Sequence, residues 1–387
     1  MILIVANEHM NLQNWYRKRG SVGIVGLILI TFSMIVLASC MNKPSMLGVL
    51  GQPKNRGNEP SPVVVQKQRG DSERTFADWC RQKASLSPEV KYTVEALLKV
   101  AGTTECDVAN QRFSSRTNLW LADNSISDIK PLEALINLEM LALNNNKISD
   151  IKPLQSLINL TDLRLNHNQI NDIKPLESLT KLTKLDSFNN SISDIKPLQS
   201  LTNLRALILN NNKISDIKPL ESLTNLTGIS LDNNQISDIK PLQFLTNLRY
   251  LFLSNNQISD IKLLESLTNL AVLYLDNNKI SDIKPLQFLT NLAVLYLDNN
   301  KISDIKPLES LTELRQLFLG NNQINDIKPL ESLTELRQLL LDNNKISDIK
   351  PLESLTELND LYLSGNPITP KTCPPKLDSI CQWEPLN

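Results

Sequence analysis

Between residues 118 and 367, apolar and polar positions follow a pattern that returns every 22 residues. In one such unit Leu273 and Leu275 flank an outward-facing Tyr274, which predicts a short strand with one inward face. The apolar positions from Ile280 to Leu289 then lead the chain back around the same core. A single unit would leave both of its flat faces in water, so the units are expected to stack on one another.

An asparagine marks the register of every unit. Its amide both donates and accepts hydrogen bonds, so it is predicted to satisfy backbone groups of adjacent coils that water does not reach. Pro285 and its equivalents in most units limit the return segment to a turn or 3₁₀ piece, and Leu263 replaces the proline in one unit. The predicted structural asparagines are Asn124, Asn146, Asn168, Asn190, Asn212, Asn234, Asn256, Asn278, Asn300, Asn322, Asn344 and Asn366.

The motif L-x-x-L-x-L-x-x-N-x-[LI], found in about twelve consecutive units, resembles that of the leucine-rich-repeat family. The string Ile-Ser-Asp-Ile-Lys-Pro-Leu is similar to the repeats of internalin-type bacterial surface proteins. The resemblance implies an α/β repeat solenoid shaped as a horseshoe or arc. A parallel β-sheet would line its concave face, with short 3₁₀ or turn segments on the convex face. It also implies that the concave face grips a protein partner.

Both ends of the repeats, residues 118–367, need covers. Residues 74–117 are predicted to form a helical N-terminal cap. Within it, Ser87 and Pro88 are suited to begin a helix and Gly102 to end it. Residues 368–387 form the predicted C-terminal cap. If Cys40 is set aside, the cysteines flank the two caps as the pairs Cys80–Cys106 and Cys373–Cys381. We expect these disulfides to form in an oxidising compartment, and free thiols are the alternative.

Residues 1–39 have the pattern of a secretory signal, with the basic cluster Arg17 to Arg19 before an apolar stretch. The stretch ends in Leu-Ala-Ser-Cys, which resembles the lipobox of bacterial lipoproteins, so Cys40 is the expected lipidation site. The alternative is an uncleaved membrane helix, and Met10 is an alternative start. Residues 40–73 are predicted to be a flexible tether. Either way, the chain would be exported and anchored in the cell envelope, in the periplasm or on the outer surface.

The outward residue between the two strand leucines is predicted to face the partner. In order, this column reads Trp120, Ala142, Arg164, Asp186, Ile208, Ser230, Phe252, Tyr274, Tyr296, Phe318, Leu340 and Tyr362. Its second half is an almost unbroken apolar stripe, and such patches often mark partner sites. The predicted partner-binding residues are Tyr250, Phe252, Tyr274, Tyr296, Phe318, Leu340 and Tyr362. The alternative is that these side chains only stack on one another as a cross-strand ladder.

Charge and composition narrow the function further. The net charge is −1, and basic and acidic residues are both spread along the chain. The absence of a concentrated basic face argues against nucleic-acid binding. Only two histidines, His9 and His167, are present for acid–base or metal chemistry, and no catalytic sequence motif is found. We therefore expect no enzyme activity, no cofactor and no metal site, and His167 is expected to be a surface residue.

Two rows of aspartates repeat with the units. The row from Asp128 to Asp348 is expected to cap the following turns, with calcium binding as the alternative. A second row on the rim of the sheet is expected to be solvated. Its members are Asp232, Asp276, Asp298 and Asp342.

One unit breaks the pattern. Ser187 replaces an inward leucine, and Phe188 follows where a polar residue is usual. Two outcomes are open: Phe188 folds inward to fill the gap, or the stack is locally deformed.

From these observations we expect a membrane-tethered, monomeric scaffold whose concave face binds a protein, with a glycan as the alternative ligand. A passive envelope spacer and an inhibitor that regulates an enzyme by surface binding are the competing functions.

Overall fold

The computed structural model describes residues 74–375 and 377–384. The predicted signal, the lipidation site Cys40 and the tether lie outside these residues. Among the described residues, no helix has both the length and the apolar character needed to cross a bilayer.

Across the described residues, thirteen strands form one parallel sheet in which each strand pairs with the next along the chain. Repeat neighbours lie side by side in register, for example Leu273 beside Leu295. The fold class predicted from the repeat pattern is therefore confirmed. The strands are β1 (Asn118–Trp120), β2 (Met140–Ala142), β3 (Asp162–Arg164), β4 (Lys184–Asp186), β5 (Ala206–Ile208), β6 (Gly228–Ser230), β7 (Tyr250–Phe252), β8 (Val272–Tyr274), β9 (Val294–Tyr296), β10 (Gln316–Phe318), β11 (Gln338–Leu340), β12 (Asp360–Tyr362) and β13 (Cys381–Gln382).

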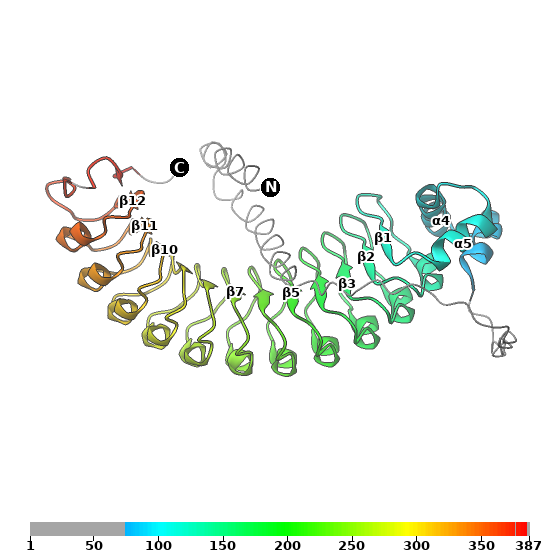
Figure 1. The fold of residues 1–387 in the computed structure, drawn as a ribbon, viewed down its shortest axis with the longest axis horizontal. Helices are drawn as coiled ribbons and strands as arrows, with labels where there is room; N and C mark the ends of the chain where they lie inside the picture. The colour runs from blue at the N-terminus through cyan, green and yellow to red at the C-terminus, as the bar shows by residue number, and fades with distance from the viewer. Residues whose placement is uncertain (1–73, 376, 385–387) are drawn as a thin grey trace, which may run out of the picture. The chain divides into compact units, whose positions relative to one another are not determined.

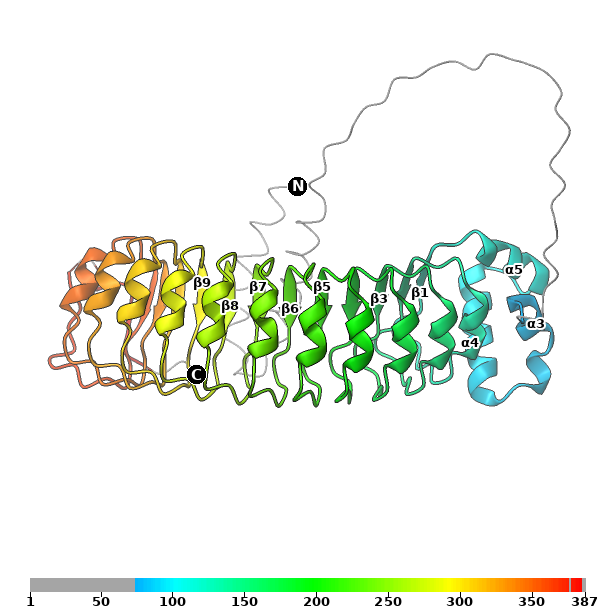
Figure 2. The ribbon, with the colours of Figure 1, turned by 90° about the horizontal axis from the view of Figure 1, so that it is seen from below.

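Residues 74–384 curve into an arc with the strands on the inner side and short 3₁₀ helices on the outer side (Figure 1). Figure 2 shows these helices in one row along the convex face. They are η3 (Lys130–Ala134), η4 (Lys152–Ser156), η5 (Lys174–Ser178), η6 (Lys196–Ser200), η7 (Lys218–Ser222), η8 (Lys240–Phe244), η9 (Lys262–Ser266), η10 (Lys284–Phe288), η11 (Lys306–Ser310), η12 (Lys328–Ser332) and η13 (Lys350–Ser354). Helix η9 forms although Leu263 stands in the proline position, so proline favours this turn without being essential to it.

Each coil turns sharply just before its ladder asparagine. Asn277, for example, has a φ of 55°, a left-handed conformation that asparagine adopts more readily than most residues. Its N–H donates to the carbonyl of Asp298 at 2.9 Å. The inward leucines and isoleucines of all units form one continuous buried core. Local turn geometry and stacking thus act together to keep successive coils in the same register.

Three α-helices cover the N-terminal end of the repeats: α3 (Phe76–Arg81), α4 (Pro88–Ala101) and α5 (Cys106–Ser114), with the 3₁₀ helix η2 (Lys83–Ser85) after α3. The predicted signals hold for α4, because the Ser87 side chain accepts from the N–H of Val90 and Gly102 adopts a φ of 66°. The Thr93 hydroxyl donates to the carbonyl of Asp128 at 2.6 Å. This contact ties α4 to the first repeat, so the cap and the array share one core.

The two cysteine pairs predicted from the sequence are confirmed. Cys80 of α3 is bonded to Cys106 at the start of α5, with 5.5 Å between their Cα atoms. Cys373 is bonded to Cys381, with 6.6 Å between their Cα atoms. The second bond places β13 beside β12 at the far end of the sheet.

The irregular unit follows neither of the two outcomes expected for it. Ser187 points inward with 0% of its surface exposed, whereas Phe188 stays outside, half-buried, and its ring packs edge-on against His167 at 4.8 Å. The stack is not deformed, because β4 pairs with both neighbouring strands in the common register. Phe188 packs against the exposed His167 on the surface, a contact that it could not make if its ring pointed inward.

Replacing Ser187 with leucine is expected to stabilise the protein by about 1–2 kcal/mol, because it restores the apolar volume that the other units carry at this position. Chemical denaturation followed by circular dichroism measures the effect. Ser187→Ala, which removes the hydroxyl without filling space, should change stability much less. A lower stability of the leucine variant would show that neighbouring side chains already occupy the gap.

Candidate binding surface

The concave face is built from three outward columns of side chains. The first column consists of the first residue of each strand, and the middle column consists of the third. The third column lies two residues later, so Val294, Tyr296 and Asp298 are one row across the face. Parallel pairing in register brings like positions of neighbouring strands together, about 4.8 Å apart. Residues 22 apart in sequence are therefore direct neighbours on this surface.

Aromatic rings of the middle column stack on one another across four strands. Phe252 meets Tyr274 edge-on with ring centroids 4.8 Å apart. Tyr274 and Tyr296 lie at 4.1 Å in a tilted arrangement, and Tyr296 and Phe318 stack nearly parallel at 3.9 Å. The cross-strand ladder considered as an alternative thus exists. It does not exclude binding, because a stacked row of rings presents a rigid apolar ridge at little cost in conformational entropy.

The residues predicted to bind a partner form one row on this face. Tyr250 stands beside the stripe in the first column, and Leu340 and Tyr362 continue the stripe beyond Phe318. The members from Tyr274 onward, like Tyr250, are half-buried. Only 5% of the surface of Phe252 is exposed, and its contact with Tyr274 contributes to this burial. From Phe252 to Tyr362 the stripe extends about 25 Å.

A polar ladder beside the stripe was missed at the sequence level. Gln316 donates from Nε2 to Oε1 of Gln338, and Gln338 donates to Oδ2 of Asp360, both at 2.8 Å. These contacts hold the first column of β10, β11 and β12 in a fixed arrangement. Their only sequence signal is that amide and carboxylate residues recur at 22-residue spacing.

The second aspartate row does not lie in open water as expected. Asp232, Asp276, Asp298 and Asp342 belong to the third column and are half-buried. Asp232 accepts the N–H of Ser254 at 2.8 Å, and Asp298 accepts the N–H of Gly320 at 2.7 Å. Asp232 and Asp298 thus lean over the adjacent strand and bond a backbone N–H there. Asp276 instead accepts the hydroxyl of Ser254, and Asp342 accepts the side-chain N–H of Asn343.

Burial raises the pKa of all four carboxyl groups above the ordinary aspartate value. For Asp298, the nearby carboxylates of Asp276 and Asp342 raise the pKa further. Like charges at strand spacing repel one another. This row would consequently be stabilised by a positive group placed beside it.

The first half of the concave face is different in character. Trp120 exposes 57% of its surface at the N-terminal end. Arg164 makes two contacts with Asp162, at 3.3 and 3.1 Å. Within the described residues, Oδ1 of the neighbouring Asp186 has no hydrogen-bond partner, and burial raises the pKa of this group. The first half of the face thus carries charges of both signs, whereas the second half carries an apolar stripe.

Beneath the third column, the ladder asparagines connect each coil to the one before it. Nδ2 of Asn278 donates to the carbonyls of Leu253 and Leu275 at 3.0 and 3.1 Å. Its Oδ1 accepts the N–H of Ile258 at 3.0 Å. Equivalent contacts recur along the array, as at Asn146 and Asn344. The amide therefore fixes the edge of the strand by bonding backbone groups of three residues.

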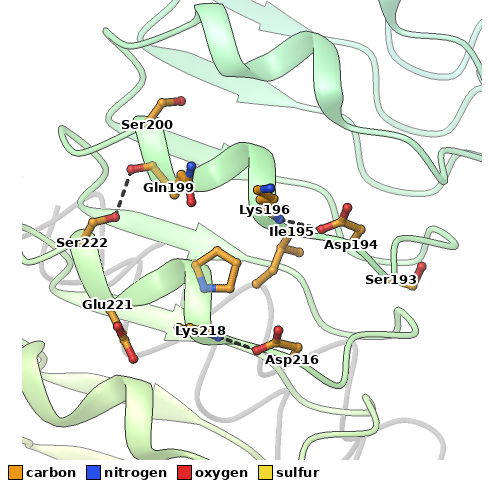
Figure 3. Close-up of a pocket in the computed structure, with 11 residues that line it drawn as sticks. Ser193, Asp194, Ile195, Lys196, Gln199, Ser200, Asp216, Lys218, Glu221 and Ser222 are labelled. Carbon is orange, nitrogen blue, oxygen red and sulfur yellow. Dashed lines mark hydrogen bonds between the residues drawn. The ribbon is translucent and has the colours of Figure 1, made fainter.

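The convex face contains a pocket between η6 and η7 (Figure 3). Several of its polar groups already bond within the repeats. Asp194 and Asp216 each accept the N–H of the lysine two residues later, both at 2.8 Å, and Ser222 donates to the carbonyl of Gln199. The same aspartate contact recurs from Asp128 to Asp348, so this row caps turns. Among the described residues, no cluster of three potential metal ligands is found.

The family described as leucine-rich repeats (2 copies) matches residues 117–156, 158–200, 187–221, 202–243, 246–287, 290–332 and 334–373. No curated protein matches the chain. Among solved structures, an internalin from Listeria monocytogenes is 36% identical, covering 76% of this chain and 93% of that chain, with a TM-score of 0.65.

Two further structures share the fold. A leucine-rich-repeat protein from Leptospira interrogans is 26% identical over 67% of this chain and 81% of its own, with a TM-score of 0.54. A plant peptide hormone receptor, solved in complex with RGF2, is 23% identical over 66% of this chain and 45% of its own, with a TM-score of 0.59.

Proposed function

We propose that this chain, which belongs to the leucine-rich-repeat family and has internalin-like repeats, is an exported scaffold that binds a protein partner through its concave face. The observation that carries the proposal is the stacked aromatic stripe on that face. Rigid aromatic side chains dominate the binding energy of many protein interfaces. The plant receptor of the same fold was solved in complex with RGF2, which is consistent with this use of the fold.

The two disulfides support export, because such bonds persist in oxidising compartments outside the cytosol. We extend the proposal to a lipid anchor at Cys40 and to a monomeric protein tethered to the envelope. The support for the anchor is the Leu-Ala-Ser-Cys sequence at the end of the apolar leader. The matched family is one of repeat scaffolds rather than of enzymes, so the proposed activity is binding without a chemical step.

The combined change of Tyr274, Tyr296 and Phe318 to serine is expected to weaken partner capture about 30-fold, since it removes the central rings of the stripe. The variant should stay folded, because cross-strand pairs contribute only about 0.2–1 kcal/mol each. Capture from envelope extract and culture medium, quantified by mass spectrometry, measures the effect. Circular dichroism checks that the variant is folded.

Phe244 and Phe288 provide a matched control. They expose 52% and 49% of their surface on the convex face. Phe244→Ser with Phe288→Ser therefore removes exposed aromatic area from the face opposite the proposed binding surface. This control should capture the same proteins as the unmodified chain. Equal capture by the folded stripe variant would contradict the proposal and favour a passive spacer. A captured glycan in place of a protein would identify the alternative ligand.

A further inference from the structure

The second half of the concave face carries charge of one sign only. Within residues 228–364, all of which the structure describes, the three columns contain five carboxylates and no lysine, arginine or histidine. These carboxylates belong to Asp232, Asp276, Asp298, Asp342 and Asp360. The aromatic stripe is thus bordered by acidic groups, and a partner that covers it must accommodate them.

At Gly320, two of these carboxylates converge from either side. A Cβ at this glycine would lie 2.6 Å from Oδ1 of Asp342 and 3.0 Å from Oδ1 of Asp298. Both oxygens therefore already take up the space that a side chain at position 320 would need. Phe318, from the aromatic stripe, stands in the same row two residues earlier. Gly320 has no side chain, so the two carboxylate oxygens fill the space beside its backbone, next to the apolar ridge.

Basic side chains stand on the opposite edge of the same strands. Arg315 and Arg337 immediately precede β10 and β11 and are exposed. The face therefore has an acidic edge, an apolar centre and a basic edge. This arrangement of charge would orient a partner, because the partner's positive groups are attracted to the acidic third column and repelled by the basic edge.

We propose that the partner segment seated on β8 to β12 presents apolar side chains to the stripe and a lysine or arginine to the converging carboxylates of Asp298 and Asp342. The inference rests on the proposed binding function and adds the chemistry of the ligand. Three features carry it: the charge of one sign in the columns, the convergence of two carboxylates at Gly320 and the adjoining rings. The mutual repulsion within the carboxylate row, which a cation would relieve, agrees with it.

Selection from a random-peptide phage library on the purified full chain tests the proposal. Bound peptides are expected to be enriched in lysine or arginine next to aromatic or aliphatic residues. Asp298→Asn with Asp342→Asn should lose the basic preference and keep the apolar one. The amide at position 298 still offers an oxygen to the N–H of Gly320, so this variant removes charge with little change in structure.

The matched control is Asp282→Asn with Asp326→Asn. These aspartates are also two repeats apart, but they cap turns, each accepting a lysine N–H at 2.9 Å. The control removes the same charge away from the concave columns and should keep the basic preference. For one selected peptide, calorimetry should show about 5-fold weaker binding to the Asp298/Asp342 variant and unchanged binding to the control.

Gly320→Ala tests the arrangement of the two carboxylates while both are retained. The added methyl group forces the Asp342 carboxylate aside, so the affinity for the basic peptide should fall while thermal stability is nearly unchanged. An apolar preference without a basic one would overturn the inference, as would a basic preference that survives in the Asp298/Asp342 variant. Either result leaves the proposed function standing. Selection that is insensitive to the stripe variant of Tyr274, Tyr296 and Phe318 would overturn both.

Discussion

Replacing Asn300 with aspartate is expected to lower the free energy of unfolding by about 3–5 kcal/mol. Nδ2 of Asn300 donates to the carbonyls of Leu275 and Leu297, both at 3.0 Å, and Oδ1 accepts the N–H of Ile280 at 3.0 Å. An ionised aspartate keeps the acceptor but has no donor. Two backbone carbonyls would then face a carboxylate at a site where Asn300 is 9% exposed.

Asn299 is the matched control for this change. It precedes Asn300, is exposed and has a φ of 53°, a conformation that aspartate also tolerates. Its backbone N–H, which bonds the carbonyl of Gly320, is unaffected by the substitution. Asn299→Asp should therefore change stability by less than about 0.5 kcal/mol. Urea unfolding of both variants decides the matter, and similar losses would mean that the ladder amides do not hold the coils together.

Removing the first disulfide is expected to have the second largest effect. Cys80→Ala with Cys106→Ala opens a loop with a sequence separation of 26 residues, which corresponds to about 3.5 kcal/mol of stability in the chain-entropy model. The bond joins α3 to α5, so its loss loosens the cap over the first repeats. Thermal unfolding should begin at the N-terminal end of the array, where hydrogen exchange can detect it.

The second disulfide serves as the internal comparison. Cys373→Ala with Cys381→Ala opens a separation of only 8 residues, for which the same model gives about 2.5 kcal/mol. The loss should be smaller, and the early hydrogen exchange should move to the C-terminal end. If both pairs of substitutions accelerated exchange at the same end, the assignment of each disulfide to its own cap would be incorrect.

The fold follows closely from the sequence because its information is local and repeated. The spacing of leucine, asparagine and proline in one unit defines a strand, a bend and a 3₁₀ turn, and stacking carries this arrangement through the array. Helix α4 was also predictable from Ser87 and Gly102. Helix α3 was missed because its six residues are too short to show a period. Its local signal is the capping box of Thr75 and Asp78, and Phe76 and Trp79 pack into the core.

The candidate surface was predictable only in part. The column from Phe252 to Tyr362 can be identified from the register of the repeats. The stacking of Tyr296 on Phe318, by contrast, depends on the rotamers of side chains that meet only when coils pack. Phe188 illustrates the same limit, because its contact with His167 lies on the surface rather than in the gap left by Ser187.

Sequence alone determined the repeat, the inward faces and the register of the asparagines, since each depends on residue type at fixed spacing. Only the tertiary structure decided how the outward side chains relate to one another. Parallel pairing sets residues 22 apart at strand spacing, and there Gln316 bonds Gln338 while Asp298 and Asp342 converge at Gly320. Such contacts arise between coils, and no single unit contains them.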